Sequence, residues 1–153
     1  MASPTREEQL AESPVGKRYP PFEYEVGREK IREYANAVGE SGPVHHDPDA
    51  ARAAGFRGVV APPMFCVVYS AGAMGPAVLD PEAGINLMMM VHGSQEFEWF
   101  EPVVAGDTIT TEVVVKDVFD KNGMKFYVWE SESRNQNGQP TVKGTWTNIV
   151  RGG

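Results

Sequence analysis

Residues 62–74, PPMFCVVYSAGAM, join a proline pair to a run of residues that are almost all apolar or small. Proline at the first position of a helix has its backbone angle already set and gives up no hydrogen bond that the helix needs. A helix that is apolar around most of its circumference has to be buried on all sides. We therefore expect a central helix, residues 64–74, with other elements packed around it.

The segments before this helix have two different periods. Residues 21–26 (PFEYEV) alternate apolar side chains with glutamates, which predicts a half-buried strand. Residues 28–38 (REKIREYANAV) carry apolar side chains at i, i+3, i+4 and i+7, which predicts a helix with one apolar stripe and Gly39 as its C-terminal cap. The stripe consists of Ile31, Tyr34, Ala35 and Val38.

A polar stretch, GESGPVHHDPDA, follows at residues 39–50. Its Gly-Pro pair interrupts helical structure, so we expect a loop over residues 40–47. Asp47 suits the N-cap of a second, short helix, Pro48 suits its first position, and Gly55 suits its end.

The second half of the chain predicts antiparallel strands separated by turn signals. The four segments are residues 86–103, 107–119, 124–133 and 141–151. Gly93 indicates a bend or bulge in the first of them, and residues 121–123 (KNG) supply a turn between the second and the third. Ile109, Val113 and Val115 fall on one face of the second segment. The order of elements predicts an α+β domain in which a curved antiparallel sheet surrounds one central helix.

Length and charge limit the remaining possibilities. The 153 residues suffice for one domain, and we expect a mobile, polar N-terminal arm over residues 1–14 and a single domain over residues 15–153. The net charge of −7 argues against a nucleic-acid partner. Prolines and glycines interrupt the longest apolar run, which argues against membrane insertion, and no signal-peptide pattern begins the sequence, so we expect a cytoplasmic protein.

Several of these segments together resemble the MaoC-like hot-dog (R)-hydratases and dehydratases. The resemblance covers about residues 15–150 and is carried by GESGPVHHDP (39–48), GFRGVVAPPMF (55–65) and VHGSQEFEWFEPVVAGD (91–107). Within the family, the chain looks most like the A-type subunit of the mycobacterial 3-hydroxyacyl-thioester dehydratase of type II fatty-acid synthesis. That likeness is carried by YEVGREKIREYANAV (24–38), APPMFCVV (61–68) and FEPVVAGD (100–107).

The resemblance implies a hot-dog fold and a dimer whose sheets join edge to edge, with an acyl thioester of CoA or of acyl carrier protein between the two units. The family's loop motif is Asp-x-Asn-Pro-x-His. Here His45 falls on the catalytic histidine and Glu40 on the aspartate, while Gly42 stands where the family has asparagine and Pro43 on its proline.

This assignment implies reversible dehydration of (R)-3-hydroxyacyl thioesters to trans-2-enoyl thioesters, with His45 as general base and acid and Glu40 as its partner. Histidine suits the reaction because its ordinary pKa of about 6.5 makes both protonation states accessible near neutral pH. The alternative from loop composition alone is that both side chains are solvated. The resemblance favours His46 as a solvent-facing neighbour, although it could itself be the site residue.

Substrate contacts are expected at the start of the central helix. Hydratases of the family commonly present a glycine N–H there to the thioester oxygen, but this chain has Pro62-Pro63, which offers none. The N–H groups of Met64 and Phe65 come next. The expected substrate-binding residues are Gly42, Pro63, Met64, Phe65 and Cys66. Cys66 is expected to be a small buried hydrophobe, although a cysteine near an acyl channel could also be trapped covalently.

Other chemistry is less favoured. The histidines at positions 45 and 46, with Asp47 and His92, lack metal-ligand spacing, so we expect no metal, and hydration needs no cofactor. His92 is expected in the core or at an interface. The three methionines of residues 88–90 are expected to pack on both faces of a strand or to line an acyl channel. Ser70 has no His/Asp partner in the pattern, which argues against a serine nucleophile.

Two other functions remain open at the level of sequence. One is a non-catalytic A-type subunit that binds acyl chains and needs a catalytic B-type hot-dog partner, as a heterodimer rather than a homodimer. The other is a hot-dog thioesterase, which would release a free thiol.

Overall fold

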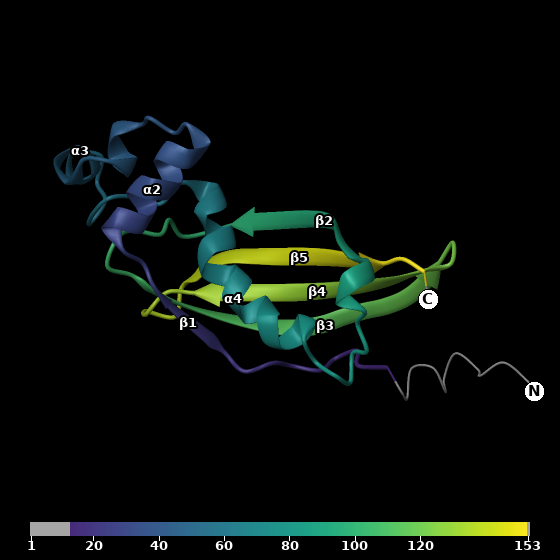
Figure 1. Ribbon diagram of the computed structural model, residues 1–153. Helices are drawn as coiled ribbons and strands as arrows, with labels where there is room; N and C mark the ends of the chain where they lie inside the picture. The colour runs from purple at the N-terminus through teal and green to yellow at the C-terminus, as the bar shows by residue number, and fades with distance from the viewer. Residues whose placement is uncertain (1–12, 153) are drawn as a thin grey trace, which may run out of the picture.

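A computed structural model of the chain describes residues 13–152 (Figure 1). In chain order, with η for a 3-10 helix, its elements are β1 (Phe22–Glu25), α2 (Arg28–Val38), η1 (Pro43–His45), α3 (Pro48–Ala53), η2 (Pro63–Phe65), α4 (Cys66–Val78), η3 (Leu87–Met89), β2 (Met90–Trp99), β3 (Thr108–Lys121), β4 (Met124–Arg134) and β5 (Pro140–Val150). The predicted arm, residues 1–14, lies outside the described residues except for its last two.

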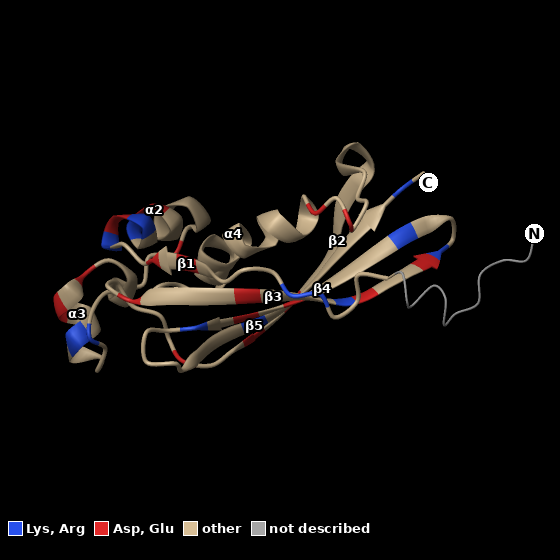
Figure 2. Ribbon diagram, turned by 90° about the horizontal axis from the view of Figure 1, so that it is seen from below, with Lys and Arg blue, Asp and Glu red and all other residues tan. Residues whose placement is uncertain are grey.

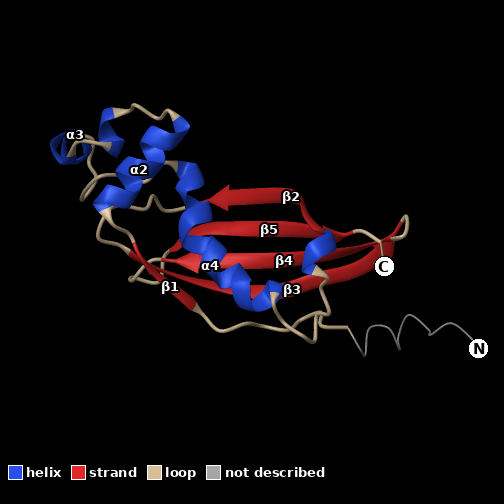
Figure 3. Ribbon diagram, viewed as in Figure 1, coloured by secondary structure: helices blue, strands red, loops and turns tan. Residues whose placement is uncertain are grey.

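The strands form one antiparallel sheet in the order β1-β3-β4-β5-β2. Helix α4 crosses one face of this sheet, while α2 and α3 gather at one end of it (Figure 3). This arrangement confirms the predicted α+β hot-dog architecture. Figure 2 shows that α4 carries no charged residue, whereas α2 and α3 carry both signs.

The local predictions before α4 are largely confirmed. Helix α2 has the predicted bounds and ends at Gly39, whose φ of 74° is the left-handed conformation of a C-terminal cap. The carboxylate of Asp47 caps α3 by accepting the N–H of Asp49 at 2.9 Å. The loop prediction for residues 40–47 is wrong in one respect, because the short turn η1 forms within it.

The predicted central helix begins as η2 and continues as α4 through Val78, beyond residue 74. The prediction that it is buried on all sides is wrong for the single chain. Ser70 and Ala73 are buried against the sheet, whereas Ala71 and Gly72 are exposed. The sheet covers one side of the helix, and within residues 13–152 part of its other side is left exposed.

The sheet confirms most of the strand predictions. Ile109, Val113 and Val115 are at most 1% exposed, as expected of one buried face. A register shift between His92 and Ser94 places a bulge at Gly93 in β2.

The methionine prediction is wrong, because β2 begins only at Met90. The side chain of Asn86 accepts the N–H of Met88 and caps η3, which turns the chain outward and leaves Met88 91% exposed. These methionines therefore neither pack on both faces of a strand nor line the cavity described below.

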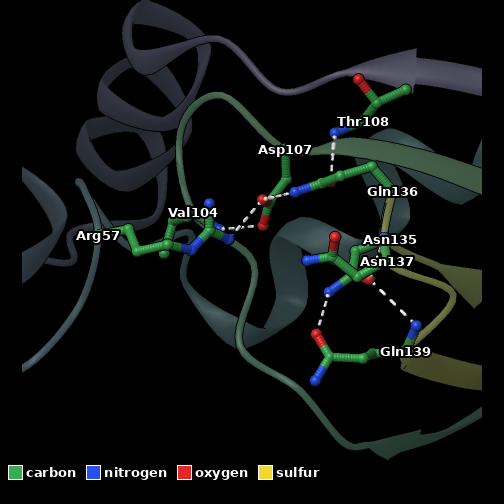
Figure 4. A network of polar contacts seen from close by, with 8 residues as sticks. All are labelled: Arg57, Val104, Asp107, Thr108, Asn135, Gln136, Asn137 and Gln139. Carbon is green, nitrogen blue, oxygen red and sulfur yellow. Dashed lines mark hydrogen bonds and ion pairs between the residues drawn. The ribbon is translucent and has the colours of Figure 1, made fainter.

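A buried carboxylate fixes the turn that leads into β3 (Figure 4). Asp107 accepts the Val104 N–H at 3.0 Å, an Arg57 guanidinium N–H at 2.7 Å and the Gln136 amide at 2.9 Å. Burial alone would raise the pKa of the Asp107 carboxyl, but these three donors hold that pKa below its usual value. The network joins three distant segments and so supports the neighbouring wall of the cavity. No helix in the described part of the chain is long and apolar enough to cross a membrane.

Candidate active site

Two hydrogen bonds to Val60 fix the position of His45, one through the His45 ring and one through the backbone of Val44. The Val60 N–H donates to the Val44 carbonyl at 2.9 Å, and His45 Nδ1 lies 2.6 Å from the Val60 carbonyl oxygen. A carbonyl oxygen can only accept, so Nδ1 carries the proton. In the neutral ring the lone pair is therefore on Nε2, the nitrogen that a general base would use.

Glu40 approaches the same ring from the end of α2. Its backbone N–H donates to the Ala35 carbonyl at 2.8 Å, and its side-chain Oε1 accepts the Gly42 N–H at 3.0 Å. A Cβ on Gly42 would lie 3.1 Å from Glu40 Oε1 and 3.7 Å from His45 Nε2. The carboxylate and the imidazole therefore face one small space above Gly42, which a larger residue would fill.

His45 also lines a cavity of about 490 Å³, whereas Glu40 and Gly42 do not line it. Aromatic side chains make up much of the cavity wall: Phe56, Tyr69, Trp99 and Phe100. These residues come from separate parts of the sequence, and Thr141 of β5 completes one side. A mostly apolar cavity with an imidazole at its edge suits a ligand that has an apolar tail and a polar reactive end.

Two hydrogen bonds fix aromatic rings of this wall. The Tyr69 hydroxyl donates to Thr141 Oγ1 at 3.4 Å, and burial raises the pKa of Tyr69, so the hydroxyl is neutral at physiological pH. Trp99 Nε1 donates to the Pro63 carbonyl at 2.8 Å and so ties β2 to the start of the α4 helix.

The residues expected to bind substrate are only partly brought together. Pro63 lines the cavity, and Gly42 lies beneath the space between Glu40 and His45. The Phe65 N–H donates to the Pro62 carbonyl at 2.8 Å, and its ring is buried. Met64 is 44% exposed and does not line the cavity.

Cys66 is buried and does not line the cavity. Burial raises the pKa of its thiol to about 11, which keeps it protonated and unreactive. This is the small hydrophobe that the sequence predicts, and it disfavours covalent trapping. Ser70 is buried and donates to the Cys66 carbonyl, so its hydroxyl satisfies the helix backbone.

Two histidine predictions need correction. The prediction that His46 points to solvent is wrong in part, because His46 is half-buried and its Nε2 lies 2.8 Å from the Glu40 carbonyl oxygen. His92 is exposed on β2, an edge strand, so the core alternative is wrong for it, while the interface alternative remains a prediction. Within residues 13–152, no group of three or more His, Cys, Asp or Glu side chains could hold a metal ion.

The aromatic wall was not predicted from the sequence. Trp99 and Phe100 follow a strand pattern and Tyr69 follows a helix pattern, so each looks like an ordinary core residue in isolation. Only their convergence in the fold gives them a common role.

A curved antiparallel sheet packed against one long, largely apolar helix matches the hot-dog fold of MaoC-like proteins. Residues 13–143 match the model of the FAS1-like, dehydratase domain region family, and the chain belongs to this family. The resemblance to MaoC-like hot-dog proteins is thereby confirmed.

Several curated relatives align with the chain over most of their length. The chain is 42% identical to a UPF0336 protein of Saccharopolyspora erythraea over 144 residues, which is 94% of this chain and 92% of the relative. It is 41% identical to a UPF0336 protein of Streptomyces avermitilis over 143 residues, covering 93% and 95% of the two chains.

Solved structures are similar over nearly the whole chain. A MaoC-like dehydratase matches with a TM-score of 0.81 and 28% identity over 92% of this chain, which spans 43% of that longer protein. The truncated HadBC (3R-hydroxyacyl-ACP dehydratase) complex of Mycobacterium tuberculosis matches with a TM-score of 0.73 and 27% identity, covering 90% and 97% of the two chains. The (R)-hydratase PhaJ1 of Pseudomonas aeruginosa shares the fold, with a TM-score of 0.72 and 19% identity over 91% of this chain and 83% of that one.

Proposed function

We propose that the protein catalyses the reversible dehydration of (R)-3-hydroxyacyl thioesters to trans-2-enoyl thioesters, with His45 as base and acid and Glu40 as its partner. The observation that carries the proposal is the position of the His45 ring, which borders the apolar cavity and shares the space above Gly42 with the Glu40 carboxylate. Membership of a dehydratase family supports the reaction class.

In the hydration direction, a water molecule occupies the space between the two side chains. Its oxygen adds to C3 of the enoyl thioester while His45 Nε2 takes one of its protons. The resulting imidazolium then returns that proton to C2, so that the elements of water are added and the enzyme is regenerated. The Glu40 carboxylate accepts the second O–H of the water and fixes the direction of attack.

Charge develops on the thioester oxygen as C3 is attacked, and this oxygen needs a hydrogen-bond donor. Pro62 and Pro63 have no N–H, and the Phe65 N–H is already bonded to the Pro62 carbonyl. We assign the donor role to the backbone N–H of Met64, which lies at the start of the helix, where the peptide dipoles favour negative charge. The reaction requires no cofactor.

The purified chain tests this proposal directly. We expect it to hydrate a crotonyl or longer trans-2-enoyl thioester of CoA or of acyl carrier protein, followed by loss of enoyl absorbance, with molecular size measured in the same buffer. Release of free thiol without hydration would identify a thioesterase instead. The absence of any turnover would reject catalysis by this chain alone.

A paired substitution tests the role of Glu40. Glu40→Gln keeps the size of the side chain but removes its charge, so we expect hydration to fall by about tenfold to a hundredfold. Glu33→Gln, within α2, is the matched control, because Glu33 is exposed and its ion pair is with the exposed Lys30. Equal activity of the two variants would exclude Glu40 from the reaction.

A second candidate is an acyl-chain-binding subunit that works only with a catalytic hot-dog partner. Two structural neighbours are complexes of different hot-dog subunits, HadBC and ChsH1-ChsH2 of Mycobacterium tuberculosis. The exposed apolar face of α4 and the edge strand β2 are the surfaces for a second hot-dog unit, either identical or different. In that case the isolated chain would bind enoyl thioesters without converting them.

A further inference from the structure

The backbone of Glu40 is held on both sides. Its N–H donates to the Ala35 carbonyl at 2.8 Å, which is the capping bond that ends α2. Its carbonyl oxygen lies 2.8 Å from His46 Nε2. A carbonyl accepts only, so this nitrogen carries the proton and His46 is the donor.

Two further hydrogen bonds restrain this part of the loop, because Glu40 Oε1 accepts the Gly42 N–H at 3.0 Å and the Gly42 carbonyl accepts the His45 N–H at 3.0 Å. Glu40 lies between Gly39, which has a φ of 74°, and a Ser-Gly pair, and it is itself exposed. Glycine and short polar residues leave the backbone many accessible conformations. The direction of the peptide after Glu40 helps to set where the carboxylate lies, and that peptide carries the carbonyl bound by His46.

The two adjacent histidines therefore hold the loop from opposite sides. The His45 ring bonds to Val60, next to the start of the central helix, and the His46 ring bonds to Glu40 at the end of α2. Their backbones are fixed by the η1 turn, in which the His46 N–H donates to the Pro43 carbonyl at 3.1 Å. One turn thus sets the position of both groups that share the reacting water.

We propose that His46 is a positioning residue, which holds the Glu40 carboxylate beside the His45 ring without touching the substrate. This role rests on the proposed function, in which Glu40 orients the water. The two histidines then have different roles: His45 takes part in proton transfer, and His46 fixes the position of Glu40.

Three substitutions of His46 test this role. The amide nitrogen of glutamine lies close to the place of Nε2, whereas that of asparagine lies closer to the place of Nδ1, and leucine has no donor. We expect His46→Leu to lower kcat about tenfold with KM within about twofold of the wild type. His46→Gln should recover activity to within about threefold of the wild type, and His46→Asn should resemble His46→Leu.

A structural role alone would lower the melting temperature or raise KM without producing this order of kcat values. Equal kcat for the glutamine and asparagine variants would overturn the proposal. Because these two variants differ by one methylene and both keep an amide, the comparison holds even where the leucine variant folds poorly.

A double-mutant cycle tests whether His46 acts through Glu40. In a Glu40→Gln background, adding His46→Leu should lower kcat by less than about twofold, because the carboxylate that it positions is already gone. Independent effects, in which the two losses multiply, would contradict a shared role.

Nitrogen-15 NMR separates this proposal from the reaction itself. We expect neutral His46 to be protonated at Nε2 in the wild-type protein. Because free histidine also prefers Nε2, the supporting observation is a His46 Nε2–H proton that exchanges slowly with solvent. This result supports the contact even if the wild type hydrates no enoyl thioester and the proposed function fails. Protonation at Nδ1 would overturn the contact whatever the activity.

Discussion

His45 Nδ1 lies 2.6 Å from the carbonyl oxygen of Val60, a residue whose own N–H is bonded to Val44. The ring is therefore attached to backbone that is itself fixed, and its orientation does not depend on a flexible partner. Since Nδ1 is the donor, Nε2 is left as the basic nitrogen, directed toward the space that it shares with Glu40.

This contact predicts the tautomer of the neutral His45 ring. Nitrogen-15 spectra of the protein, recorded above the pKa of its histidines, should show His45 protonated at Nδ1, although free histidine prefers Nε2. His92 is the internal control, because it is exposed on the edge strand and is expected to follow the preference of free histidine. An Nε2-protonated His45 would mean that its basic nitrogen faces Val60 and not the cavity.

Because α4 packs closely against Phe22 of β1, adding one methyl group at Gly72 is expected to lower the stability of the fold. A Cβ on Gly72 would lie 2.3 Å from Cζ of the Phe22 ring, so Gly72→Ala should lower the free energy of unfolding by about 1–3 kcal/mol. Denaturant titration measures this change. In a Phe22→Ala background the same substitution should lose its cost, because the ring is gone.

Gly75 provides the matched control within the same helix. A Cβ on Gly75 would meet nothing within 4 Å, so Gly75→Ala should raise stability by up to about 1 kcal/mol through helix propensity. Equal effects at the two positions would show that α4 does not approach β1 as described.

The buried Asp107 carboxylate predicts a dependence of stability on pH. Its donors hold its folded-state pKa below the value of about 3.9 expected for an unfolded chain. Its contribution is therefore fully present above pH 4 and is lost as the pH falls toward the folded-state pKa. Asp107→Asn should lower the free energy of unfolding by about 2–3 kcal/mol at pH 7, with a smaller difference from wild type below about pH 4.

Glu112→Gln is the control for this prediction, because Glu112 is exposed on the neighbouring strand β3. Its substitution should change the free energy of unfolding by less than about 0.5 kcal/mol. A difference between Asp107→Asn and wild type that stays constant from pH 7 to pH 3 would contradict the depressed pKa.

The buried thiol of Cys66 predicts low reactivity. With a pKa of about 11, roughly one molecule in a thousand carries the thiolate at pH 8, and the sulfur is also covered by the fold. Alkylation by iodoacetamide at pH 8 should be at least about a hundredfold slower than that of free cysteine and should become fast in denaturant. Rapid alkylation of Cys66 in the folded protein would contradict this prediction and would favour the alternative that Cys66 can be trapped covalently.

The sequence predicted well the features that depend on neighbouring residues. The apolar stripe and the Gly39 cap that predict α2 lie within the helix or directly after it. The Asp47 carboxylate caps α3 by accepting the N–H of Asp49, only two positions away. The bulge at Gly93 was predicted because a glycine in the middle of a strand pattern marks a bulge, a bend or a close approach of another backbone.

Features that depend on distant partners were predicted poorly. The apolar pattern of α4 could not indicate which layers cover it, and the apolar methionines of η3 gave no sign that Asn86 turns them outward. The cavity wall joins side chains as far apart as Phe56 and Thr141. The contact between His46 and Glu40 was missed because the loop motif describes residue types and not the direction of each ring.

Turnover by His45→Ala, compared with wild type on the same trans-2-enoyl thioester, tests the central claim most directly. We predict that its rate of hydration is lower by more than about a hundredfold while its melting temperature stays close to that of the wild type. A His45→Ala protein that hydrates the substrate at nearly the wild-type rate would contradict the account.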